Sequence, residues 1–457
     1  MSWQHGYHTE SPYTCGFYRE LAPDWLDFAV LLRGQPSPRS RAGEAFHYLE
    51  LGSGMGLGLC LLAAAYPEGQ FIGIDFKPDH ILHSRRLANE LRLSNVVFRE
   101  GDFLSLAKDP GDLRGHHDYV VAHGILTWIT ESVQQALLSL AAAALKPGGL
   151  FYCSYNTLPG WLATVPLQRL AWDLARTGLS ANEAVTRAAA TLTELLGPEE
   201  QPAPLGRALP GLRNRLAQLP QQDPAYLAQE YVNEGWQPLS VAVMHERAAA
   251  HKLQYAASAS LVENFEVLLA ENVRQTVLAE ADPGRRQQLF DLAILQTFRR
   301  DVLVRGRLGL TAADQRKALS ELSLRLREAP ALETYTFPTS LGAVTGRSEL
   351  YQELERCLAA GPLRFDALQT KLGLDLPGLA QGVALLLDAG RLALDRGAAG
   401  EAALEAALRV NSSLRELQRQ GSPYSFLVAP RAGTAVPFGL VEALLLHDPD
   451  PAGLPNA

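Results

Sequence analysis

The sequence predicts an α/β protein: a doubly wound sheet with helical insertions, followed by a separate, mostly helical, winged-helix-like unit. Three observations support this prediction. The chain has 457 residues, which is too long for one ordinary core. From residue 46 onward, short apolar strands alternate with amphipathic helices, as in parallel sheets. The sequence YLELGSGMGLG, residues 48–58, joins one such strand to a helix through alternating glycines.

The composition is that of a globular protein with no general attraction to polyanions. The net charge is −8, so we expect no specific nucleic acid and no membrane as a partner. The four cysteines lie far apart without a C-x-x-C pair, which predicts neither a disulfide framework nor a zinc site. The N-terminal residues show no signal pattern, and the longest apolar run, Ala136–Leu145, is about half of a membrane span. We therefore expect a cytoplasmic protein.

Residues 1–44 are rich in aromatic side chains and interrupted by prolines, and we expect an N-terminal arm with a short helix at Pro23–Leu32. Tyr13, Tyr18 and Trp25 belong to this arm. Aromatic residues at helical spacing usually pack into a core. The alternative is that the arm forms a lid over a ligand site.

The glycine-rich turn follows a predicted buried strand, Phe46–Leu51. Its glycines, Gly52, Gly54 and Gly56, alternate along the chain, and Glu50 precedes the first of them by two residues. Glycine allows a ligand to approach the backbone closely, and the helix that follows offers free N–H groups. The spacing does not fit the G-x-G-x-x-G motif of dinucleotide sites, because leucine occupies the third position.

Acidic residues follow the next two predicted strands. Asp75 ends the strand Gln70–Ile74, where an acid often binds a ribose hydroxyl pair or, alternatively, caps the next helix. Asp102 follows the strand Asn95–Arg99. Because ligands bind at the carboxyl edge of such sheets, we expect these acids to lie close together.

The fourth and fifth predicted strands deliver polar and aromatic loops to the same edge. Strand Asp118–Ala122 leads into HGILTW, which begins at His123, and strand Leu150–Tyr155 leads into Asn156 and TLPGW. His123 either orients a second ligand or bonds the backbone. These two loops are where a second substrate should bind.

Together these segments resemble a known family. The spacing E-x-G-x-G-x-G is similar to the first motif of class I S-adenosylmethionine (SAM) methyltransferases. PYTCGFYRELAP, AHGILTWI, SYNTLPGW and YLAQEYVNEGWQPLSV resemble bacterial members that carry a methyltransferase regulatory domain. That group includes protein-lysine methyltransferases. The resemblance covers roughly residues 10–305 and implies a Rossmann-like class I sheet with SAM as cofactor.

The resemblance also implies site roles. In such enzymes Glu50 would lie near the methionine amino group and Asp75 at the ribose. Asp102 would meet the adenine amino group beside Phe103, unless its Gly-Asp pair only forms a turn. The expected cofactor contacts are Glu50, Gly52, Ser53, Gly54, Gly56, Asp75, Phe76, Asp102, Phe103 and His123. The candidates to orient the methyl acceptor are His123, Tyr155, Asn156, Tyr13 and Tyr18.

We expect four parts in the chain: the arm 1–44, a SAM-binding core 45–160, a helical insertion with the regulatory region 161–308, and an accessory domain 309–457. The segments Leu253–Ala257 and Thr297–Val304 read as the last two strands of the sheet. The polar-aromatic segment Asp223–Trp236 precedes them without an assigned role.

The accessory domain has helices and a strand in the order of a winged helix. A DNA reader needs lysine or arginine on its second helix. Helix Pro377–Ala389 has neither, so we expect protein docking or a homodimer contact instead. Plain stabilisation of the enzyme is the alternative.

The leading functional prediction is methyl transfer from SAM to a lysine of a protein substrate. Two alternatives stay open: a small-molecule acceptor, and a SAM-binding regulator without catalysis. The large accessory domain argues against the first, and the intact loops after the fourth and fifth strands argue against the second.

Overall fold

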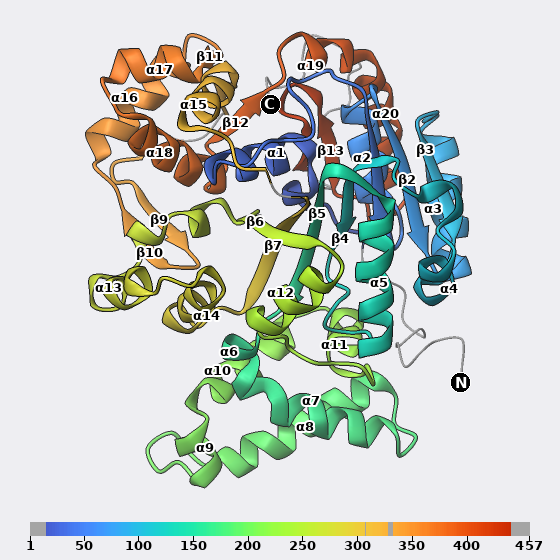
Figure 1. Ribbon diagram of the computed structural model, residues 1–457. Helices are drawn as coiled ribbons and strands as arrows, with labels where there is room; N and C mark the ends of the chain where they lie inside the picture. The colour runs from blue at the N-terminus through green and yellow to red at the C-terminus, as the bar shows by residue number, and fades with distance from the viewer. Residues whose placement is uncertain (1–14, 307, 328–331, 440–457) are drawn as a thin grey trace.

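The computed structural model describes residues 15–306, 308–327 and 332–439. Within these residues, seven strands form one mixed sheet in the order β3-β2-β1-β4-β5-β7-β6 (Figure 1). The strands are β1 (Phe46–Leu51), β2 (Gly69–Asp75), β3 (Val96–Glu100), β4 (His117–Ala122), β5 (Leu145–Asn156), β6 (Leu253–Ser258) and β7 (Phe298–Arg305). The predicted α/β fold is confirmed.

The first five strands are parallel, as predicted, whereas β7 runs antiparallel to β5 and to β6. The segments predicted as the last two strands both join the sheet. Because β1, β2, β4 and β5 are parallel, their carboxyl ends meet at one edge of the sheet. The amino-terminal end of β7 lies at the same edge, since Phe298 pairs with Asn156.

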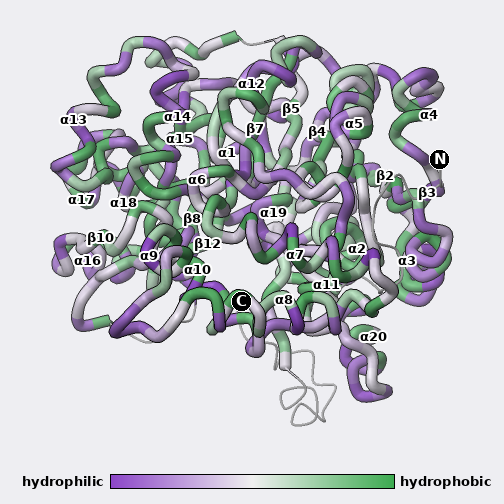
Figure 2. Tube along the Cα trace, turned by 90° about the horizontal axis from the view of Figure 1, so that it is seen from below, coloured by the Kyte–Doolittle hydropathy of each residue, from purple (hydrophilic) through white to green (hydrophobic). Residues whose placement is uncertain are grey.

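Helices cover both faces of the sheet, and the alternation of side chains in β1 shows why. Phe46 and Tyr48 belong to one apolar core, while Leu49 and Leu51 belong to the other. The first core contains α1 (Pro23–Leu32), α2 (Leu57–Ala65) and α3 (Pro78–Glu90); the second contains α5 (Glu131–Ala144) and α12 (Val241–Ala250). In Figure 2 the peripheral helix α3 carries many hydrophilic residues, as expected for a covering layer.

A helical lobe follows β5 and lies beyond one end of the sheet (Figure 1). It contains α7 (Val165–Ala175), α8 (Ala181–Leu196), α9 (Pro204–Ala208), α10 (Pro210–Gln218) and α11 (Pro224–Tyr231). The lobe has its own apolar core, which includes Trp161, Leu192 and Tyr231. Helix α8 begins with a capping box between Ser180 and Glu183. The lobe therefore forms a wall next to the strand ends.

The C-terminal part builds sheets of its own. Strands β8 (Ser323–Leu326), β11 (Leu363–Arg364) and β12 (Leu392–Asp395) form one antiparallel sheet, and β13 (Phe426–Ala429) pairs with β14 (Thr434–Pro437). Its helices include α15 (Ala312–Glu321), α16 (Ser348–Leu358), α17 (Phe365–Leu372), α18 (Leu376–Asp388) and α20 (Leu404–Arg419). The winged-helix comparison stays a prediction.

These C-terminal elements pack directly on the N-terminal half of the chain, which contains the glycine-rich turn. Helix α2 contacts α20, β13 and β14, and the apolar core on that side of the sheet continues into α18. One buried cation joins the two halves: Arg396 donates hydrogen bonds to the Ala65 carbonyl and to Glu68. It also lies 3.1 Å from Asp24 Oδ2, with its guanidinium 4.0 Å from the centre of the Tyr66 ring.

Candidate active site

The glycine turn after β1 folds back onto the end of β2. The Gly52 and Ser53 N–H groups both donate to the Ile74 carbonyl, at 2.7 and 3.0 Å. Gly52 has φ +78°, and a Cβ there would lie 2.2 Å from Ile125 Cδ1. Glycine is thus required at this position by backbone conformation and by packing, so the turn stays thin beside the cavity.

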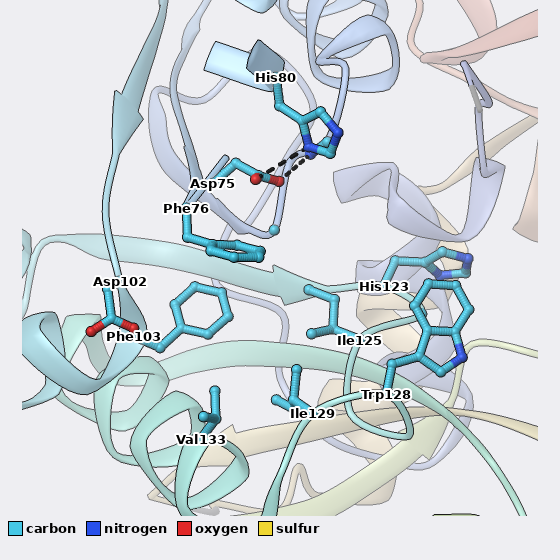
Figure 3. Close-up of a pocket in the computed structure, with 13 residues that line it drawn as sticks. Asp75, Phe76, His80, Asp102, Phe103, His123, Ile125, Trp128, Ile129 and Val133 are labelled. Atoms are coloured by element: carbon cyan, nitrogen blue, oxygen red, sulfur yellow. Dashed lines mark hydrogen bonds and ion pairs between the residues drawn. The ribbon is translucent and has the colours of Figure 1, made fainter. Parts of the chain in front are cut away.

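Asp75 fixes this turn from the end of β2. Its Oδ2 accepts a hydrogen bond from Gly54 N at 2.9 Å, and its Oδ1 accepts one from Lys77 N at 2.9 Å. His80 Nδ1 lies 3.2 Å from Oδ1 (Figure 3). The N-cap residue of α3 is Lys77, so Asp75 is not the helix cap. Its carboxylate supports the turn and also borders the cavity next to it.

That cavity, which we call the main pocket, lies at the carboxyl edge between the glycine turn and α5. Phe76 and Phe103 project into it from the ends of β2 and β3, opposite Ile125 (Figure 3). Its lining residues are Gly52, Gly54, Asp75, Phe76, His80, Asp102, Phe103, His123, Gly124, Ile125, Trp128, Ile129 and Val133. A slot with two phenyl rings, aliphatic walls and acids at its rim fits a flat heteroaromatic group joined to a polar sugar.

Asp102 lines the main pocket and also caps α4 (Phe103–Lys108). Its carboxylate accepts hydrogen bonds from Leu104 N at 3.3 Å and from Ser105 N at 3.2 Å. Asp102 is thus the N-cap of α4, a local role that differs from the Gly-Asp turn that we weighed as the alternative. A contact with adenine stays a prediction.

A second cavity, the loop pocket, lies at the glycine turn and shares Gly52, Gly54 and His123 with the main pocket. Glu50 lies in its wall, and Gly52, Ser53, Gly54 and Gly56 line it as well. Glu50 is only 9% exposed, and among the described residues no hydrogen bond to its carboxylate is present. Burial, together with the charge of Asp75, raises the pKa of Glu50 to about 8. A buried carboxylate without a protein partner calls for a cationic or hydrogen-bonding ligand.

A third cavity, the side cavity, extends from the end of β4 to the helical lobe and has a volume of about 730 Å³. Its wall includes Tyr18, Trp128, Asn156, Trp161, Arg215, Tyr226, Glu230, Phe298 and Arg300. This volume accommodates a long side chain together with some of its neighbouring backbone. Asn156, predicted on the acceptor side, lies in this wall.

His123 borders all three cavities. Its Nδ1 lies 2.9 Å from the Tyr152 hydroxyl and 3.1 Å from Ser154 Oγ, which itself accepts a hydrogen bond from Gly124 N. The ring centre lies 3.8 Å from that of Tyr18. Burial and the nearby Arg300 lower the pKa of His123 to about 3. The imidazole is therefore neutral and unsuited to take a proton from an ammonium.

Tyr155, another residue predicted on the acceptor side, does not line any of the three cavities. Tyr155 is fully buried and donates to Asp301 Oδ2 at 2.6 Å, between the sheet and α12. Neighbouring residues of a strand point to opposite faces, and Ser154 is the residue that faces His123. The assignment of Tyr155 to the acceptor side is wrong. Tyr13 lies outside the described residues.

Glu230 is a site residue that the sequence did not single out as functional. It belongs to α11, and Asn156 Nδ2 donates to its Oε1 at 2.7 Å. The Trp236 indole N–H lies 3.4 Å from the same oxygen. Burial raises the pKa of Glu230 to about 7, against hydrogen bonds from Trp128 and Trp236 that lower it. The polar and aromatic residues of the segment Asp223–Trp236 could have pointed to a site, but nothing in the sequence indicates that this segment contacts the end of β5.

Among the described residues, no group of three or more His, Cys, Asp or Glu is placed to hold a metal ion. Over the same ranges, no helix combines the length and apolar character of a membrane span.

Comparison with known proteins gives two family matches. Residues 43–186 match a family described as a methyltransferase domain, and residues 223–305 match a predicted methyltransferase regulatory domain. An uncharacterized protein of Synechocystis is 32% identical over 98% of this chain and 88% of its own length. The trans-aconitate 2-methyltransferase of Methylobacterium nodulans is 34% identical over 22% of this chain and 34% of its own length.

Among solved structures, PKMT2 of Rickettsia typhi in complex with AdoHcy aligns with a TM-score of 0.64. The two chains are 20% identical over 84% of this chain and 77% of that one. At this identity the likeness shows a shared fold.

The match to the regulatory domain, residues 223–305, has a structural consequence. This segment supplies β6 and β7 of the central sheet, as well as Glu230 in the wall of the side cavity. The regulatory-domain segment, residues 223–305, is therefore an integral part of both the central sheet and the candidate site.

Proposed function

The chain belongs to the methyltransferases that carry a methyltransferase regulatory domain, and we propose that it transfers a methyl group from SAM to a lysine side chain of a protein. Its cofactor is SAM, which supplies an electrophilic methyl group on a positively charged sulfur. We assign adenine to the main pocket between Phe76 and Phe103, the ribose to Asp75, and the methionine amino group to Glu50. The carboxylate of Glu50, which has no hydrogen-bond partner among the described residues, suits that cation.

One observation carries the lysine assignment: the side cavity begins at His123, where the two cofactor pockets also meet, and a buried carboxylate lies in its wall. Two indole rings, those of Trp128 and Trp161, line the same cavity. Aromatic faces attract an ammonium group by ~0.5–2 kcal/mol. A cation can therefore be drawn into this cavity before it is deprotonated.

The fold gives further support. PKMT2 is a protein-lysine methyltransferase, and it shares the fold over most of this chain. Catalysis needs no covalent intermediate, because holding the nitrogen in line with the methyl group supplies most of the rate enhancement. Asn156 and Tyr18 lie where they can orient the acceptor.

A second candidate has its own observation. Arg215 and Arg300 also line the side cavity, and two arginines suit an acceptor with a carboxylate. The trans-aconitate 2-methyltransferase named above acts on such an acid, although it matches only the SAM-binding part. Methyl ester formation on a small acid is therefore the competing function.

Labelled SAM and a fractionated lysate distinguish the two. We expect the label in the protein fraction, on a methyl-lysine that survives acid hydrolysis. Label in the small-molecule fraction that is released by mild base would replace lysine with a carboxylate acceptor. A variant with Glu50→Gln, which weakens cofactor binding, is the control for enzyme-dependent labelling.

A further inference from the structure

We propose that Glu230 binds the acceptor ammonium and removes its proton before methyl transfer. This inference rests on the proposed lysine function and assigns the residue that makes the lysine nucleophilic.

The first argument is position. Glu230 lines the side cavity, and among the described residues of that wall it is the only carboxylate. Its neighbour Asn156 ends β5 and also lines the cavity, so the 2.7 Å hydrogen bond between them ties the carboxylate to the edge where His123 lies. The carboxylate is 2% exposed, which strengthens its attraction for an entering cation.

The second argument is that the other groups of the wall cannot accept the proton. His123 has a pKa of about 3 because of burial and Arg300. Burial raises the pKa of Tyr18 and of Tyr226, so both hydroxyls stay protonated. Arginine does not deprotonate in proteins. A group with a pKa near the working pH is the most effective general base, and Glu230, at about 7, meets that condition.

The third argument is that this wall already binds a cation. The Arg215 guanidinium lies 4.9 Å from the centre of the Trp161 ring, and its Nε donates to the Tyr231 hydroxyl at 2.8 Å. The titratable groups facing Glu230 are Arg215, Tyr226 and Tyr231; only the arginine is charged near neutral pH. An acceptor ammonium would thus enter a cavity with aromatic walls that holds two guanidinium groups, those of Arg215 and Arg300, and among its described lining residues one carboxylate, that of Glu230.

The step balances as follows. The lysine ammonium gives one proton to the Glu230 carboxylate, which leaves a neutral amine and a neutral carboxylic acid. The amine lone pair forms the N–C bond while the C–S bond breaks. The electron pair of the broken C–S bond stays on sulfur. The methylated product is again an ammonium, and the proton on Glu230 leaves through the side cavity to solvent.

The test compares Glu230→Gln with Glu263→Gln in the 457-residue chain. Glu263 is a matched control, since it is also buried, lies in the same 223–305 segment and accepts hydrogen bonds from Ser258 and Gln296 without lining the side cavity. The acceptor is total lysate protein, and the product measured is methyl-lysine. We expect Glu230→Gln to lower the rate by about 10²- to 10⁴-fold. Binding of S-adenosylhomocysteine by calorimetry should change less than twofold in either variant.

Two further readouts separate proton transfer from a structural role. With SAM saturating at every pH, which removes the effect of Glu50 on cofactor affinity, the wild-type rate should rise with pH through about 7, and this limb should be absent in Glu230→Gln and present in Glu263→Gln. Infrared difference spectra should show a carboxyl group titrating near pH 7 that only Glu230→Gln removes. Equal rates and pH profiles in Glu230→Gln and wild type would overturn the inference alone. Absence of methyl-lysine with the wild type would overturn the proposed function and the inference with it.

Discussion

Cofactor binding should depend on pH through Glu50. Burial and Asp75 raise the pKa of this carboxyl to about 8, so the group is mostly protonated at pH 7 in the free enzyme. Cys60 and Tyr48, which lie close enough to feel its charge, keep their protons because burial raises their pKa values too. Pairing with the methionine amino group requires an ionised Glu50. Affinity should therefore fall as the pH is lowered through 8.

The size of this pH dependence follows from the ionisation of two groups, the Glu50 carboxyl and the amino group of the ligand. The ligand amino group has a reference pKa of about 7.7–8.0, so it loses its charge above that range. Because binding needs a negative Glu50 and a positive amino group, affinity should peak near pH 8 and be about 20-fold lower at pH 6. At pH 7, binding should release close to one proton, since most Glu50 starts protonated and ends ionised.

Titration calorimetry with S-adenosylhomocysteine at pH 6, 7 and 8 measures the affinity at each pH. Repeating the titration in buffers of different ionisation enthalpy gives the number of protons released on binding. Glu50→Gln should bind more weakly at pH 8 and lose the acidic limb of the profile. An affinity that is constant between pH 6 and 8 would refute the reasoning, and so would a Glu50→Gln variant that keeps the 20-fold dependence.

Three further predictions concern residues with structural roles. Asp75→Asn should weaken SAM binding by about 10- to 100-fold, because a charged acceptor for Gly54 N and for the ribose is lost. Each such hydrogen bond contributes about 1.5–3 kcal/mol. Unchanged affinity by calorimetry would contradict the assignment of Asp75 to the ribose. Arg396→Met should lower the free energy of unfolding by about 1.5–3 kcal/mol, since half-buried Glu68 and the Ala65 carbonyl lose a charged donor, whereas Asp24 keeps its ion pair with Arg39. The exposed Arg356→Met is its control, with an expected loss below about 1 kcal/mol in guanidinium denaturation. Tyr155→Phe should cost about 1–3 kcal/mol of stability and leave SAM affinity and methyl transfer unchanged; a selective loss of transfer would return Tyr155 to the acceptor side.

Much of the cofactor half could be predicted from local sequence. The glycine turn, the strand before it and the acids at the ends of β2 and β3 all lie within about sixty residues, and parallel strands bring their carboxyl ends to one edge. The turn places Gly52 and Gly54 beside Asp75 for this reason. Whether Asp102 contacts adenine did not follow, because the same carboxylate can cap α4.

The acceptor side was harder to predict because it depends on contacts between distant segments. Glu230 meets Asn156 across 74 positions of the chain, and no periodicity or spacing signals that contact. The error at Tyr155 has a different cause. A strand end carries residues to the sheet edge, but alternate side chains leave on opposite faces. Ser154 therefore contacts His123 and Asn156 lines the side cavity, whereas Tyr155 points to the other face.

Helix α2 lies between the central sheet and the C-terminal elements, so the two parts of the chain pack against each other through it. The glycine turn runs straight into this helix, and eight of its nine residues are buried. One side packs on the sheet, while α20, β13 and β14 cover the other. His83 adds a polar link, because its Nδ1 lies 2.8 Å from the Met55 carbonyl of the turn and its Nε2 lies 2.8 Å from the Tyr424 hydroxyl. These contacts hold the glycine turn and the helix that follows it against the C-terminal elements.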